Sequence, residues 1–425
     1  LKHPLPIFSN DKKQSAGEDL NNFILKENKI LFLLILNIAI LIYACANINI
    51  SYDEAQIYFS HSSFLRKQGF LHELTGLSVG VFGGILGLDF AIRMPFVCAH
   101  LINIYLFYLL SREILISHDD SILSVMIFMF LPGVLASAVL VNNAVFIIML
   151  SLGALLCFSY SRFKTLIFLL ALSIFISNAF ITLYLALFFY ALYTKNRAYG
   201  VLGAIFILVW LFVFDFEISG KPRGYLLDTM AIYAAVFSPF IFIYFIYALY
   251  RIWVKESKDF LWFISCVAFC LSLVISVRAK APLEAFLPFC VIFLPQMLRL
   301  FLNSMRVRLP AFRTKYKILG AFLLFSLILQ NLASIFNAPL YLLNQNAKNH
   351  FMYNYDIAKE LATKLKQNDV YSVYTSDEKL RLRLKFYGID SSFKARLSTQ
   401  QCAKNASKIS IEKLGKQIAL FYLCK

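Results

Sequence analysis

Long apolar runs, separated by charged residues or by breaks that contain proline, glycine or asparagine, dominate the pattern of this chain. About 20 mostly uncharged residues are enough for a helix to cross roughly 30 Å of hydrocarbon. The runs therefore predict an all-α membrane bundle of about eleven spans. These lie at 30–46, 94–110, two within 121–161, two within 165–194 that turn near Asn178, 199–214, 231–250, 260–277, 282–298 and 318–335.

The pattern changes after residue 339, where polar residues become frequent. Helical periodicity at 355–367 and 378–387 alternates with strand-like runs at 370–375 and 418–424, which predicts a small α/β domain. The chain thus divides into a polar N-terminal segment, a bundle whose first outer loop spans 47–93, and this final domain. Their ranges are 1–29, 30–339 and 340–425.

Composition agrees with a membrane protein. Hydrophobic residues make up 60% of the chain and aromatic residues 16%, and the mean hydropathy is +0.69. A soluble core of 425 residues cannot bury that much apolar surface, so a polytopic membrane protein is the predicted class.

Lysine and arginine are unevenly distributed among the connections between the predicted spans. They gather in 1–29, 111–120, 161–164, 194–199, 251–259 and 299–317. Because positive charge resists translocation, this bias predicts a cytoplasmic N-terminus. An odd number of spans then places the first outer loop and the 340–425 domain on the other side. The chain's formal charge is +17, and the basic final domain suits anionic lipid head groups, although ordinary solvated charge is the alternative.

Several chemistries are not indicated. The chain has no P-loop, dinucleotide-binding glycine pattern, HExxH or nucleophile elbow, so neither ATP-driven chemistry nor a nucleic-acid partner is expected. The glycine-rich stretch at 76–84 is interpreted as a flexible interfacial loop. Six cysteines lie in or beside apolar runs, where they pack as small hydrophobes, and no metal site is predicted. In the final domain, Cys402 and Cys424 are predicted to form a disulfide worth about 3 kcal/mol.

An acidic pair follows the first predicted span. Ser51 and Glu54 have the spacing of a capping box, in which each side chain satisfies a free amide at the start of a helix. That structural role and a catalytic role for Glu54 both remain open. The helix dipole alone explains Asp53 less well, because ionisable groups at a membrane boundary are often part of a site. Asp53 is the main candidate functional residue.

This segment carries a resemblance to a known family. The aromatic-Asp-Glu-Ala-x-x-Tyr pattern at 52–58, directly after a first span, resembles GT-C glycosyltransferases of the protein O-mannosyltransferase and lipid A aminoarabinose transferase type. Further similar segments lie at 88–96, 108–112, 278–288 and 384–388.

The resemblance implies a GT-C-like bundle in a bacterial inner membrane, with the final domain periplasmic or extracellular. It also implies an inverting transfer of a sugar from a polyprenyl-phosphate donor to a glycolipid, polysaccharide or protein acceptor. An aspartate of the first loop, here Asp53, would be the general base. A carboxylate within hydrogen-bond reach can take the acceptor's proton, and the lipid phosphate leaves without needing a paired acid.

Other residues are candidates for supporting roles. Glu73 could orient the acceptor, or a divalent cation together with His72, or be an ordinary loop residue. The donor phosphate would be bound by cations at the outer boundary, for which snorkelling to the interface is the alternative role. These candidates are Arg93, Lys221, Arg223, Arg278 and Lys280.

A transporter or flippase of lipid-linked sugars is the rival class. Such proteins tend to have internal repeats and charged or broken helices near mid-bilayer. Neither feature is evident in the middle runs of this chain.

Overall fold

The computed structural model describes residues 16–59, 69–214, 224–336, 339, 341, 350, 352–392, 395–400 and 407–424. Two compact units make up the chain, Leu1–Ile40 and Leu41–Lys425. Helix α1 (Ala16–Asn47) begins in the first unit and ends in the second. All that follows concerns the second unit.

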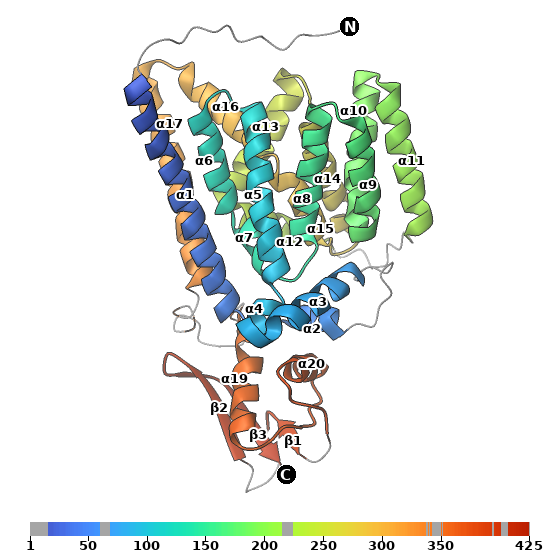
Figure 1. Cartoon of the computed structure of the whole chain (residues 1–425), viewed down its shortest axis with the longest axis vertical. Helices are drawn as coiled ribbons and strands as arrows, with labels where there is room; N and C mark the ends of the chain where they lie inside the picture. The colour runs from blue at the N-terminus through green and yellow to red at the C-terminus, as the bar shows by residue number, and fades with distance from the viewer. Residues whose placement is uncertain are drawn as a thin grey trace. The chain divides into compact units, whose positions relative to one another are not determined.

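Helices that run side by side build most of this unit, up to Phe336 (Figure 1). In chain order they are α5 (Met94–Ile114), α6 (His118–Met129), α7 (Pro132–Val139), α8 (Ala144–Ser159), α9 (Phe163–Ile176), α10 (Ile181–Thr194), α11 (Arg197–Val213), α12 (Leu226–Phe237), α13 (Pro239–Lys255), α14 (Phe260–Arg278), α15 (Leu283–Val291), α16 (Leu294–Arg306) and α17 (Pro310–Ile335).

Several of these helices could cross a membrane. Four helical segments of the described chain are long and apolar enough, or up to eight if each bent pair of helices counts as one span. Helices α8 and α9, the short 3-10 turn with α10, and α11 are apolar but shorter. The predicted helical architecture with several candidate membrane spans is therefore confirmed, whereas the predicted number of about eleven spans stays a prediction.

Prolines mark three of the four bends in the paired helices. Pro132 begins α7, Pro239 begins α13 and Pro295 lies in the first turn of α16. The axes bend there by 58°, 106° and 41°. Proline has no amide hydrogen and clashes with the preceding turn, which favours a break or bend at these positions.

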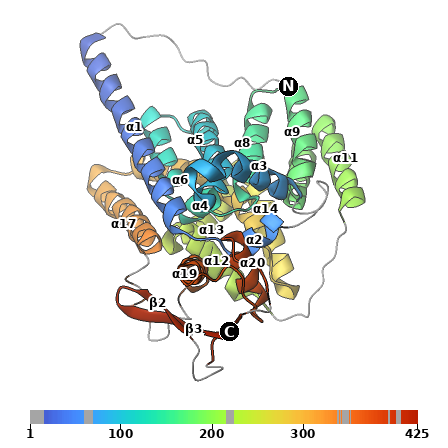
Figure 2. The same ribbon diagram turned by 60° about the horizontal axis from the view of Figure 1, so that its bottom comes forward.

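Three helices lie across one end of the bundle (Figure 2). They are α2 (Tyr52–Phe59), α3 (Gly69–Leu86) and α4 (Leu88–Ala91). The predicted flexible loop at 76–84 is wrong, because these residues belong to α3. Leucine, valine and isoleucine recur there at helical spacing between the glycines, and this pattern outweighs the helix-weakening effect of glycine.

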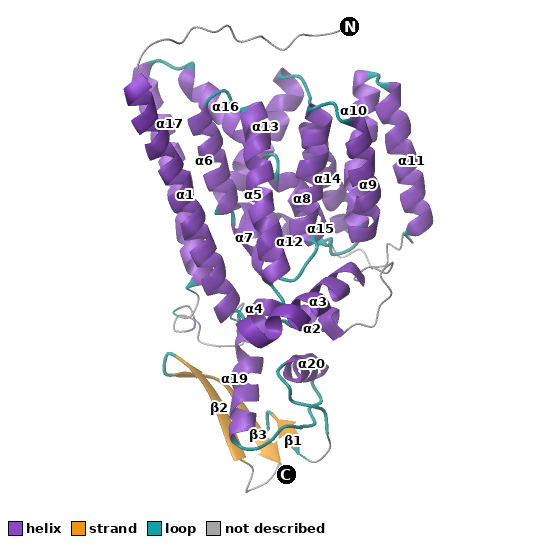
Figure 3. Ribbon diagram, viewed as in Figure 1, coloured by secondary structure: helices purple, strands orange, loops and turns teal. Residues whose placement is uncertain are grey.

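The small domain at the end of the chain combines helices with an antiparallel sheet (Figure 3). Its helices are α19 (Tyr353–Gln367) and α20 (Glu378–Phe386). The strand order is β1-β3-β2, with bounds β1 (Arg396–Ser398), β2 (Ser407–Lys413) and β3 (Lys416–Cys424). Apolar side chains from both helices and the sheet form one buried cluster.

The prediction of an α/β domain is confirmed in its two helices and its final strand. The predicted strand at 370–375 is wrong, since this segment makes only isolated bridges through Ser372 and Tyr374. Strand β2 was not predicted, although Ile409 and Ile411 alternate with polar residues and point into the core.

Close packing of α10 against α11 gives a test of the fold. A Cβ at Gly203 would lie 3.0 Å from the backbone nitrogen of Phe188, whereas one at Gly200 would lie 3.6 Å from the Ala191 methyl. We expect Gly203→Ala to cost about 1–3 kcal/mol through overpacking. Gly200→Ala should be neutral or stabilising by up to about 1 kcal/mol, because it removes a helical glycine. Thermal unfolding in detergent compares the two variants, and equal midpoints would contradict this packing.

Candidate functional site

The capping box predicted at the start of α2 is present. The Ser51 hydroxyl accepts a hydrogen bond from the amide of Glu54 at 3.1 Å. In return, the Ser51 amide donates to Oε2 of Glu54 at 2.8 Å. The two side chains thus satisfy free amides at the helix start, and the Glu54 carboxylate is held against the backbone.

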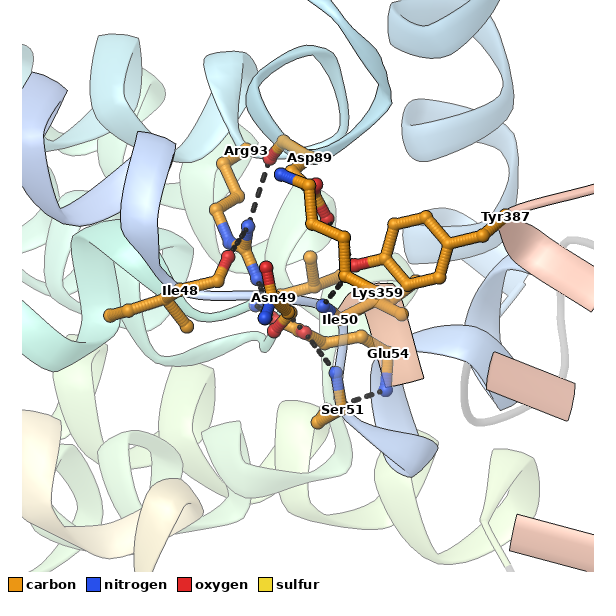
Figure 4. A network of polar contacts seen from close by, with 10 residues as sticks. Ile48, Asn49, Ile50, Ser51, Glu54, Asp89, Arg93, Lys359 and Tyr387 are labelled. Atoms are coloured by element: carbon orange, nitrogen blue, oxygen red, sulfur yellow. Dashed lines mark hydrogen bonds and ion pairs between the residues drawn. The ribbon is translucent and has the colours of Figure 1, made fainter. Parts of the chain in front are cut away.

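Arg93 lies fully buried beside this helix start (Figure 4). Its guanidinium forms an ion pair with Glu54 at 3.2 Å. It also donates hydrogen bonds to three carbonyl oxygens, those of Ile48 at 2.6 Å, Asn49 at 3.2 Å and Asp89 at 2.9 Å. One side chain therefore ties the end of α1 to α2 and to the turn before α5.

Glu54 is equally enclosed, with 2% of its surface exposed. Its second oxygen, Oε1, accepts a hydrogen bond from the Val141 amide at 3.1 Å, so the segment between α7 and α8 joins the same network. A buried charge is tolerated only when it is paired and hydrogen-bonded, and both conditions are met here.

These contacts change how two candidates are viewed. Glu54 was a catalytic candidate and Arg93 a phosphate-binding candidate, but in this structure both are enclosed and engaged with protein groups. The sequence did not predict this pairing, because the local pattern around an arginine at a membrane boundary does not distinguish one that faces solvent from one that faces a buried carboxylate. We therefore assign Glu54 and Arg93 a structural role.

Asp53 has the opposite environment. Its side chain is exposed and makes no hydrogen bond or ion pair with any described residue. Neighbouring residues on a helix point about 100° apart, so packing Glu54 inward turns Asp53 outward. Glu284, in the first turn of α15, lies close enough for its charge to interact with that of Asp53.

The final domain contacts this end of the bundle through Asp89. We call the group of charged residues gathered here, Asp53, Glu54, Asp89 and Arg93, the charged layer. The Asp89 carboxylate forms an ion pair with Lys359 of α19 at 2.8 Å and accepts a hydrogen bond from the Tyr387 hydroxyl at 2.6 Å. The same hydroxyl accepts a hydrogen bond from the Ile50 amide at 3.0 Å. Burial, with a further contribution from Asp89, raises the pKa of Tyr387, so this hydroxyl stays protonated as a donor.

Helix α20 lies over α2. The rings of Phe386 and Tyr58 meet edge to face at 5.4 Å. Lys379 lies over Tyr52, with Nζ 5.6 Å from the ring centre, and Lys385 lies over Phe59 at 4.7 Å. Neither lysine has a carboxylate partner among the described residues. Two exposed cations thus flank the helix that carries Asp53.

Tyr355 of α19 completes the surroundings of Asp53. It hydrogen-bonds with Ser51, and burial raises the pKa of its hydroxyl, with the charges of Glu54 and Asp53 adding to the effect. The final domain therefore reaches the start of α2 from a second helix.

The remaining candidates are more scattered. Glu73 is exposed on α3, and the neighbouring His72 ring lies 3.1 Å from the Ile57 carbonyl oxygen. Among the described residues no group of three or more His, Cys, Asp or Glu side chains could hold a metal ion. Arg278 and Lys280 are exposed at the end of α14 and in the connection to α15.

Some candidates lie outside the described residues. Lys221, Arg223 and Cys402 fall in segments that the structure does not describe. Cys424 is disulfide-bonded, and its predicted pairing with Cys402 stays a prediction.

Sequence reasoning missed several residues around Asp53. Glu284 and Lys359 carry no local signal, since each is an ordinary charged residue in an ordinary helix. Tyr387 could have been found, because it belongs to the Phe-Tyr-Gly segment at 386–388 on which the family resemblance partly rests. What the resemblance did not indicate was its partner, Asp89.

The fold and the site define a helical protein with several helices able to cross a membrane and a charged layer at one end of them. No family model matches this chain, and the comparison with curated proteins found no match.

The buried ion pair can be tested by a double-mutant cycle. Arg93→Met should cost about 3–5 kcal/mol, because it leaves the Glu54 charge buried without its partner. Adding Glu54→Gln should recover part of that loss. Unfolding midpoints in detergent measure each variant, with Arg278→Met as a control for loss of an exposed arginine. A double variant no more stable than Arg93→Met would contradict the pairing.

The disulfide prediction has its own test. Protein alkylated without reduction should show Cys402 and Cys424 protected from the reagent, whereas the free cysteines of the helices react after unfolding. Reduction should lower the stability of the final domain by about 3 kcal/mol. Mass analysis that finds both residues alkylated before reduction would exclude the bridge.

Proposed function

We propose that this chain is an inverting glycosyltransferase that moves a sugar from a polyprenyl-phosphate carrier to a glycolipid, polysaccharide or protein acceptor at a membrane surface. One observation supports this above the others. Of three carboxylates gathered in the charged layer, Glu54 and Asp89 are buried and paired, whereas Asp53 is exposed and unpaired among the described residues. A general base needs that freedom, because it must meet the acceptor hydroxyl.

The reaction would proceed in one displacement. The acceptor oxygen attacks the anomeric carbon while its proton passes to Asp53. The bond from that carbon to the phosphate oxygen breaks, and the carrier phosphate leaves with the bonding electrons. Attack opposite to the leaving group inverts the anomeric centre. Glu284, beside Asp53, is suited to accept hydrogen bonds from sugar hydroxyls.

The leaving phosphate needs positive charge more than it needs a proton. Arg278 and Lys280 are exposed near the start of the helix that carries Glu284. Lys379 and Lys385 contribute charge from the final domain. We propose that Arg278 and Lys280 bind the donor phosphate and that Lys379 and Lys385 contact the acceptor.

We also propose that the chain crosses a bacterial inner membrane about eleven times, with a cytoplasmic N-terminus and a periplasmic or extracellular final domain. This number follows if α8, α9, α10 and α11 each cross despite their length and if each bent pair of bundle helices counts once. Helix α3 is one of the four segments long and apolar enough to cross, but in this proposal it lies in the interface, in keeping with its orientation across the end of the bundle (Figure 2).

Asp53→Asn should abolish sugar transfer, since a positioned general base typically contributes about 10²–10⁴-fold. The measurement compares membrane glycolipids and glycoproteins by mass spectrometry in cells without the gene and in cells complemented by wild type or variant. Wild type should restore one sugar mass that the Asp53→Asn variant does not.

Glu113→Gln is the matched control, because it neutralises a carboxylate in the last turn of α5, at the opposite end from Arg93. It should restore the sugar mass, and both variants should insert in the membrane at wild-type levels. Asp53→Asn activity above about a tenth of wild type would remove Asp53 from the role of base.

A further inference from the structure

The turn between β2 and β3 places a leucine where its backbone is strained. Leu414 has φ of 50° and Gly415 has φ of 75°. Asparagine and glycine favour such left-handed positions, whereas a leucine there is disfavoured by its Cβ. The side chain gains little from the domain in return, since 60% of its surface is exposed. Among the domain's described residues no other large hydrophobic side chain is as exposed.

The base of this turn is fixed to one position in the chain. Lys416 donates a hydrogen bond to the carbonyl oxygen of Tyr341 at 2.9 Å. Lys413 pairs with Asp356 at 3.5 Å, and the Tyr341 hydroxyl donates to the same carboxylate at 2.8 Å. The ring of Tyr341 is buried against Ile418 of β3. The hairpin is therefore held against Tyr341.

Tyr341 follows closely after the last bundle helix. Helix α17 ends at Ile335, and a chain from Phe336 to Tyr341 spans at most about 18 Å. Phe336 is 55% exposed and its ring centre lies 5.6 Å from that of Tyr43. Tyrosine is enriched at the interface between hydrocarbon and water, which favours that level for Tyr43 and for the ring packed against it. The base of the hairpin thus lies within reach of that level.

The direction of the hairpin also brings its turn toward the last bundle helix. The turn joining β2 and β3 lies at the end of the hairpin nearest α17 (Figure 3). Leu414 belongs to this turn, because β2 ends at Lys413 and β3 begins at Lys416.

We propose that the turn around Leu414 inserts into the phospholipid head-group layer of this same membrane. The leucine side chain would enter the apolar boundary, and Lys413 and Lys416 would lie beside it at the level of the lipid phosphates. Apolar residues flanked by lysine are the usual composition of segments that rest in this layer. Contact with lipid explains why an exposed leucine occupies a position that favours asparagine. The inference does not depend on the reaction proposed above.

Tryptophan fluorescence in nanodiscs made with brominated phosphatidylcholine tests this contact. Leu414→Trp is compared with Tyr371→Trp, whose native side chain is 58% exposed and which follows α19 at its far end. The wild-type protein, with its three native tryptophans, gives the background. We expect quenching of the added tryptophan to be at least about threefold greater at 414 than at 371. Equal quenching, or none at either position, would overturn the proposal.

A second measurement uses the chain without a new tryptophan. Amide hydrogen exchange at 412–417 should be slower in phospholipid nanodiscs than in a lipid-free amphipol. Leu414→Asn should remove that difference while leaving the domain at least as stable, because asparagine relieves the backbone strain. Exchange that is the same in both environments for the wild-type chain would overturn the proposal, and protection that survives Leu414→Asn would do the same.

Discussion

The buried ion pair between Arg93 and Glu54 is the constraint on which the charged layer depends. Two charges removed from water must be compensated by each other and by hydrogen bonds, and the carbonyl oxygens at the end of α1 and before α5 supply the remainder. This requirement fixes four segments at once: the end of α1, the start of α2, the turn before α5 and the connection around Val141. A shift in any of them would leave a buried polar group unpaired, which costs more than the contact itself contributes.

Asp89 extends this constraint to the final domain. Its carbonyl oxygen accepts a hydrogen bond from Arg93, while its carboxylate holds Lys359 and Tyr387. The backbone of one residue is therefore positioned by the ion pair and its side chain positions α19 and the end of α20. The domain's attachment and the geometry of α2 are coupled through a short path. A change that disturbs the ion pair should also loosen the domain, although no residue of the domain touches Arg93 directly in the contacts described.

Sequence patterns predicted those parts of the fold that depend on local spacing. Apolar runs predicted the bundle helices, and the Ser51 to Glu54 spacing predicted the capping box. The pairing of Arg93 with Glu54 joins residues far apart in the chain, and no local pattern distinguishes a buried arginine from an exposed one. The contact between Tyr387 and Asp89 joins residues 298 positions apart and was not predicted for the same reason. The candidate site could therefore be located from sequence at Asp53, but the residues that surround Asp53 could not be predicted.

Asp53 is a candidate functional residue because its side chain is exposed, whereas that of the adjacent Glu54 is buried. Helical geometry alone separates the two carboxylates, because the capping box and Arg93 draw Glu54 inward and leave Asp53 facing out. Glu284, which interacts electrostatically with Asp53, has the same charge, and like charges at the end of an apolar bundle repel each other. Such an arrangement becomes favourable when hydroxyl donors or cations enter between the carboxylates. In the reaction proposed above, the sugar would supply the hydroxyls, and the exposed Lys379 and Lys385 beside α2 and Arg278 and Lys280 before α15 would attract the phosphate of the same donor.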